Sequence, residues 1–110
     1  MDLNNYRNGI RDFAVYPDAR TGKLLEIMYL SLGLAGEVGE VLNKVKKLFR
    51  DGDSADKRAE LRKELGDVFW YLVRLCDTLS FDIDLILEQN YNKLNDRKQR
   101  GVIGGSGDSR

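Results

Sequence analysis

The chain has 110 residues, 33% of them charged and 42% hydrophobic, and its 18 basic residues balance 18 acidic ones. A net charge of zero argues against a nucleic-acid-binding protein, which usually carries a basic excess. Because the chain has no histidine, it can have neither an imidazole base nor a histidine metal ligand. Its single cysteine excludes an intrachain disulfide. Charges interrupt every apolar run, and no signal-peptide pattern opens the chain, so we expect a cytoplasmic protein without membrane association.

The first predicted element is a short amphipathic helix over residues 3–15, where apolar side chains recur at helical spacing. This helix is expected to stop at Tyr16, because Pro17 disfavours helix in the residue before it. A loop over 18–22 follows, and its Thr21 is predicted to cap the next helix.

The second predicted helix covers residues 23–50, and Gly52 just after it suits a left-handed C-terminal position. An apolar three-four repeat along this helix predicts a seam against a partner helix. One position of that seam is the acidic Glu37, which is expensive to bury unless it is paired or bound to a cation. The seam consists of Leu30, Leu34, Glu37, Val41, Val45 and Leu48.

Three glycines, Gly33, Gly36 and Gly39, surround this glutamate. Each lowers intrinsic helix stability by roughly 0.5–1 kcal/mol relative to alanine. Their placement predicts either a close approach by another backbone or a ligand, or a kink or tight helix packing.

A third helix is predicted over 55–79 and a fourth over 83–97, with Asp82 as the N-cap of the fourth. The glycine-rich residues 101–110 are expected to form a flexible tail. On the fourth helix, the side chains expected to pack inward are Ile83, Leu87, Tyr91 and Leu94.

These elements predict an all-α, four-helix-bundle-like single domain. It would comprise an N-terminal helix and loop (1–20), a helical core (21–100) and the tail (101–110). Long apolar seams in so small a chain leave surface that a second copy can cover, so we expect a homodimer or homotetramer.

Two acidic pairs carry the clearest chemistry, and their i, i+3 spacing places each pair on one helical face. If all four carboxylates converge within about 5 Å, each like-charge contact costs about 3 kcal/mol at an effective dielectric constant near 20. Protonation, basic neighbours or a divalent cation would relieve that repulsion. Mg²⁺ is the best candidate because it takes carboxylate oxygens and bridges to phosphates, and Mn²⁺ can substitute. The pairs are Glu37 with Glu40, and Glu64 with Asp67.

A plainer alternative is a solvated acidic face in which Glu40 forms an i, i+4 ion pair with Lys44. On that interpretation the chain is a non-catalytic helical dimerisation or interaction module whose acids make salt bridges.

The segments 34–41 and 63–72 resemble the MazG-like branch of the all-α nucleoside triphosphate pyrophosphatase superfamily. The family signature is Glu-x-x-Glu followed, after an interval, by Glu-x-x-Asp. Further matches occur at 90–94, Arg97 and 105–110. The resemblance implies Mg²⁺-dependent hydrolysis of a (deoxy)nucleoside triphosphate to the monophosphate and pyrophosphate, with dUTP selectivity as a narrower alternative. It also implies that metal ligation and catalysis fall to Glu37, Glu40, Glu64 and Asp67.

The substrate would be held by basic and polar side chains. Lys93 and Arg97 lie one helical turn apart and can offer positive charge to the triphosphate, or else form a solvated basic turn. Asn90 shares their face. Many family members carry a further glutamate where this chain has Gly36, which leaves the number of bound metal ions open. The predicted substrate-binding residues are Lys44, Asn90, Lys93, Arg97 and, for stacking on the base, Tyr16.

Overall fold

A computed structural model describes residues 1–110. The prediction of an all-α fold is confirmed, since the chain contains no strand. Its compact units are Met1–Ser80 and Phe81–Arg110. None of the helices is both long enough and apolar enough to cross a membrane. In chain order the elements are α1 (Leu3–Ile10), the 3₁₀ turn η1 (Arg11–Phe13), α2 (Leu24–Asp51), α3 (Ala55–Thr78) and α4 (Ile83–Gln99).

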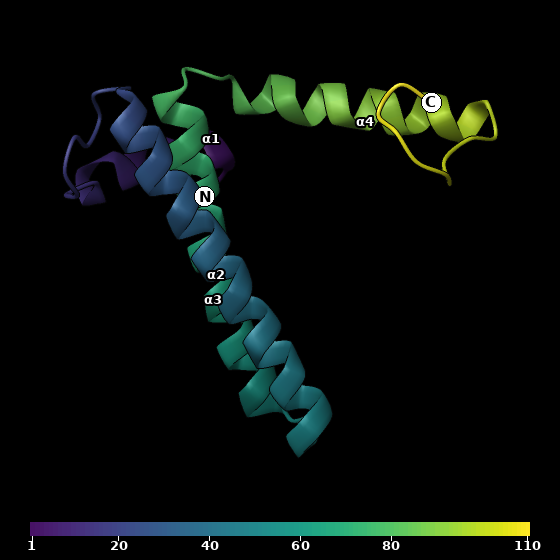
Figure 1. Ribbon diagram of the computed structural model, residues 1–110, viewed down its shortest axis with the longest axis horizontal. Helices are drawn as coiled ribbons and strands as arrows, with labels where there is room; N and C mark the ends of the chain where they lie inside the picture. Colours follow the sequence, from purple (N-terminus) through teal and green to yellow (C-terminus); the bar gives the residue numbers. More distant parts are fainter. The chain divides into compact units, whose positions relative to one another are not determined.

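Helices α2 and α3 form the framework of the first unit and run antiparallel, side by side (Figure 1). The turn between them uses Gly52 with a φ of +93°, in the region that favours glycine, as the sequence predicted. Helix α3 then begins after Ser54, whose hydroxyl accepts a hydrogen bond from the Lys57 amide at 3.2 Å. The seam prediction is correct for Leu30, which is fully buried, and wrong for Val45, which is 45% exposed.

The glycines of α2 have different surroundings. A Cβ atom on Gly33 would overlap the Tyr71 ring of α3, so this glycine allows the close packing of the two helices. Gly36 and Gly39 face open space, because a Cβ atom at either position would meet no neighbouring segment within 4 Å. Tight helix packing therefore explains Gly33, whereas neither a neighbouring backbone nor a side chain explains the other two.

The N-terminal segment differs from its prediction in two places. The predicted helix over 3–15 is too long, because α1 ends at Ile10 and the tighter 3₁₀ turn η1 follows it. Thr21 does not cap α2; the N-cap is Lys23. Instead, the Thr21 hydroxyl donates to the Asp18 carbonyl at 2.7 Å and accepts from the Lys23 amide at 3.2 Å. Its hydrogen bonds close the preceding loop, which is why the cap position shifts.

In the second unit, Asp82 is the N-cap of α4 as predicted, and its carboxylate accepts from the Asp84 amide at 3.0 Å. The inward packing of three apolar side chains is wrong: Leu87, Tyr91 and Leu94 are exposed. Their unit holds no second helix for α4 to pack against.

Candidate metal centre and its surroundings

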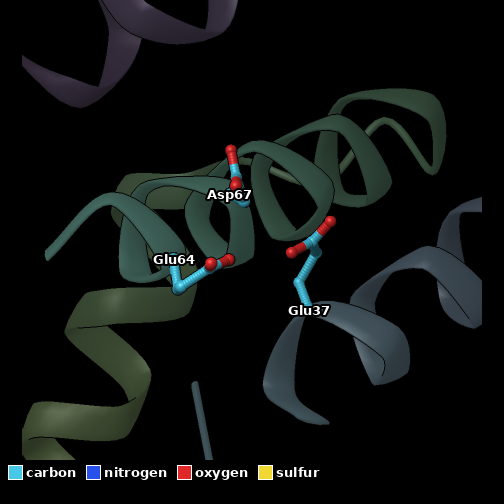
Figure 2. A group of neighbouring side chains, drawn as sticks. All are labelled: Glu37, Glu64 and Asp67. Atoms are coloured by element: carbon cyan, nitrogen blue, oxygen red, sulfur yellow. The ribbon is translucent and has the colours of Figure 1, made fainter. Parts of the chain in front are cut away.

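Three of the four predicted acids come together on the facing sides of α2 and α3. Glu37 extends from α2 toward α3, which carries Glu64 and Asp67 (Figure 2). One carboxylate oxygen from each residue lies within 4.8 Å of the others. We call these three residues the acidic cluster. The i, i+3 spacing on α3 turns two carboxylates to one face, and the antiparallel packing brings the third opposite them.

The electrostatics of the acidic cluster are those of crowded like charges. Burial raises the pKa of Glu37, and the charges of Asp67, Glu64 and Glu40 raise it further. Glu40 therefore contributes to the field, although its exposed side chain is outside the acidic cluster. Glu40 and Lys44 do not form the ion pair of the plainer alternative, although the exposure of Glu40 fits a solvated acidic face at this position.

An aromatic cluster lies along α2 and α3 in the same unit. Tyr16 stacks on Tyr29 with ring centroids 4.6 Å apart, and its edge-to-face partner is Trp70 at 6.3 Å. Trp70 in turn contacts Tyr71 at 5.0 Å. Tyr16, predicted from the sequence to bind the base, thus already uses its ring in contacts with two aromatic side chains of its own unit. Its role in substrate binding stays a prediction.

The hydroxyl of Tyr16 leads to a buried ion network that sequence reasoning missed. It donates to Glu26 at 2.6 Å, and Glu26 also accepts from Arg74 at 3.3 Å. Both Glu26 and Arg74 are at most 1% exposed, and Arg74 donates to Asp77 at 2.7 Å. A signal was present, because Glu26 precedes the fully buried Leu30 by one helical turn and so extends the same seam.

At Glu26, hydrogen bonds lower the pKa of the carboxyl group by more than burial raises it. Burial by itself would raise its pKa, but donors from the Thr78 and Tyr16 hydroxyls and from the backbone amides of Gly22 and Arg20 lower it to about 2. The amides lie at 2.9 and 2.7 Å. The N-terminal loop is therefore fastened to the start of α2 by a carboxylate that stays ionised.

The predicted basic residues of α4 do lie together. Lys93 Nζ and Arg97 Nη2 both donate to one Asp108 carboxylate oxygen, at 2.7 and 3.1 Å. Their bonds lower the pKa of Asp108. Arg97 is 5% exposed, whereas Asn90 is exposed and has no such partner. The tail residues thus lie against α4, and Arg110 donates to the Gly104 carbonyl at 2.9 Å. Flexibility of the tail stays a prediction.

An apolar pocket of about 320 Å³ adjoins the acidic cluster. Its lining includes Gly66 and Phe69, which flank Asp67 on α3, and Tyr6 of α1. Burial raises the pKa of Tyr6, and the charge of Asp67 raises it further. Sequence reasoning did not find this pocket, because it depends on how α1 packs on α3.

Comparison with known proteins identifies the family of this chain. The family model of the MazG nucleotide pyrophosphohydrolase domain matches residues 27–102, which include the whole acidic cluster. Gene 37 protein of Mycobacterium phage L5 is 43% identical over 114 aligned positions that span all of both chains. No solved structure matches the chain. Because the family match covers more than half of the sequence, the chain belongs to the MazG nucleotide pyrophosphohydrolase domain family.

Proposed function

We propose that this protein hydrolyses (deoxy)nucleoside triphosphates to the monophosphate and pyrophosphate in a Mg²⁺-dependent reaction. Family membership supports nucleotide pyrophosphohydrolase activity in general. The observation that carries the finer proposal is the convergence of three carboxylates from two helices within 4.8 Å. Mutual repulsion makes such a group unfavourable without a counter-charge, and all its donors are hard oxygens.

The residues present fit a hard divalent cation. The raised pKa of Glu37 reports burial and the neighbouring negative charges, and a bound cation would offset both. We assign ligation to Glu37, Glu64 and Asp67, with Glu40 completing the set from the next turn of α2. Mn²⁺ can use the same oxygens. A cation bound there would polarise the phosphates and make the attacking water more acidic.

The side chains of this chain supply the remaining chemistry. Glu37 serves as the general base that accepts a proton from the water attacking the α-phosphorus. Lys93 and Arg97 bind phosphate oxygens through the donors that now hold Asp108. Lys44 adds positive charge from α2, and Asn90 hydrogen-bonds the phosphate or the sugar.

Self-association accompanies this proposal. Several large apolar side chains of α2 and α3 are exposed, and among them Phe49 is 95% and Leu42 62% exposed. Exposed apolar surface of this kind favours a second copy of the chain, as a homodimer or homotetramer. Light scattering coupled to size-exclusion chromatography measures the mass directly, and a monomer at micromolar concentration would contradict this part of the proposal.

The test is a pyrophosphate-release assay over the common ribo- and deoxyribonucleoside triphosphates with Mg²⁺, which also reveals any preference for dUTP. Activity should disappear in Glu64→Gln and Asp67→Asn. The matched control is Glu60→Gln, one turn earlier on α3, whose carboxylate pairs with Lys63 at 3.2 Å. If no triphosphate is hydrolysed and Mg²⁺ leaves the melting temperature of the wild type unchanged, the non-catalytic interaction module is the better interpretation.

A further inference from the structure

A second pocket, of about 340 Å³, lies where the N-terminal loop meets the C-terminal end of α3. Three guanidinium groups line it, those of Arg11, Arg20 and Arg74, together with one carboxylate, that of Asp77. The pocket is therefore rich in cationic donors. The proposed hydrolysis uses none of these residues.

Asp77 cannot balance these charges. Arg11 donates to both of its oxygens at 2.7 Å, and Arg74 donates to one of them at 2.7 Å. The other nearby carboxylate, Glu26, already accepts from the Tyr16 hydroxyl and from backbone amides in addition to Arg74. Both carboxylates thus have their acceptors engaged.

Two cationic groups at this pocket have donors without acceptors. The side chain of Arg20 takes part in no ion pair and no hydrogen bond. Arg74, although 1% exposed, has a buried Nε with no hydrogen-bond partner. The Arg74 Nε is enclosed by the protein, so a ligand in the pocket would be held by the accessible guanidinium of Arg20, whose donors are free to take its acceptors.

The backbone at this pocket includes two non-glycine residues of positive φ. Arg20 and Ser80 both line it, and both have positive φ, +61° and +58°. The value at Ser80 is the left-handed conformation that commonly follows a helix end, whereas Arg20 adopts it within the loop. Positive φ at a third non-glycine residue, Asp18, occurs in the same loop. The loop therefore holds a strained conformation where it presents Arg20.

We propose that this pocket binds the phosphate group of a small phosphorylated molecule. Guanidinium groups form paired hydrogen bonds with phosphate oxygens, and the hydroxyl groups of Thr21, Thr78 and Ser80 also line the pocket. Arg74 follows Asp67 by two helical turns, about 10 Å along α3, so the anion site and the acidic cluster share one helix.

Inorganic phosphate is the probe, titrated in EDTA and followed by calorimetry and by backbone amide shifts at 20–22 and 74–80. Arg20→Gln should weaken phosphate binding by about tenfold or more, since one charge-assisted pair is lost. The control is Arg62→Gln, an exposed arginine of α3 outside this pocket, which should bind like the wild type. Binding that is absent from the wild type, or unchanged in Arg20→Gln, overturns the proposal.

Two further experiments distinguish phosphate binding in this pocket from binding at the proposed active site. Phosphate affinity should be unchanged in Glu64→Gln and in Lys93→Gln, even if both variants lose hydrolysis. A loss of phosphate binding in Lys93→Gln would place the anion on α4 and overturn the assignment. Comparing a nucleoside monophosphate with inorganic phosphate then identifies the source of the phosphate group. Tighter binding of the nucleotide indicates that the pocket also takes the group to which the phosphate is attached.

Discussion

Glu26→Gln tests whether the buried ion network stabilises the fold. The wild-type carboxylate is fully buried and ionised, with a pKa near 2 in place of 4.5. A difference of about 2.5 pKa units, at about 1.4 kcal/mol per unit, corresponds to about 3 kcal/mol of stability at neutral pH. The substitution also removes the buried anion opposite Arg74, which is destabilising in the same direction.

The stabilisation contributed by the Glu26 carboxylate should depend on pH. Because the folded-state pKa is lowered, the contribution is present above about pH 4.5 and is lost as the pH falls toward 2. The gap in unfolding free energy between wild type and Glu26→Gln should therefore shrink from about 3 kcal/mol at pH 7 to about 1.5 kcal/mol at pH 3.

Urea denaturation followed by circular dichroism measures this gap, at one fixed protein concentration because self-association would add to stability. Glu88→Gln, which removes an exposed carboxylate of α4, is the control and should change the free energy by less than about 0.5 kcal/mol. A gap below about 1 kcal/mol at pH 7, or one that is equal at pH 7 and pH 3, would refute the reasoning.

Gly33→Ala should lower the free energy of unfolding by about 1–3 kcal/mol, because the new methyl group would overlap the Tyr71 ring. Gly36→Ala should raise it by about 0.5–1 kcal/mol, because the added methyl group meets no neighbouring segment. Thermal denaturation compares the two variants, and equal shifts in melting temperature would contradict the packing described. Asp108→Asn removes the anion held by two basic side chains of α4, so the tail should gain fast backbone motion in heteronuclear NOE measurements; an unchanged profile would show that the carboxylate does not fasten it. Burial raises the pKa of the Cys76 thiol, so alkylation by iodoacetamide at pH 8 should be slower than that of free cysteine, and a rate equal to free cysteine would be inconsistent with this environment.

Much of the local structure could be predicted from the sequence because its signals lie within one helix. The i, i+3 spacing of Glu64 and Asp67 predicted that both carboxylates share a face, and both belong to the acidic cluster. Asp82 was recognisable as an N-cap from its position before an apolar periodic segment. Periodicity failed for Leu87 and Tyr91, since it shows which side chains share a face and not whether anything covers that face.

The sequence by itself determined the all-α class, the approximate helices and the acidic pairs, because helical periodicity and capping are local properties. Only the tertiary structure decided which acids meet, leaving Glu40 outside the acidic cluster that Glu37 joins. It also paired Glu26 with Arg74, 48 residues apart in the chain, and gave the basic residues of α4 an internal anion in Asp108. Such pairings depend on how neighbouring segments align, and a helical repeat fixes the face of a side chain without fixing its partner.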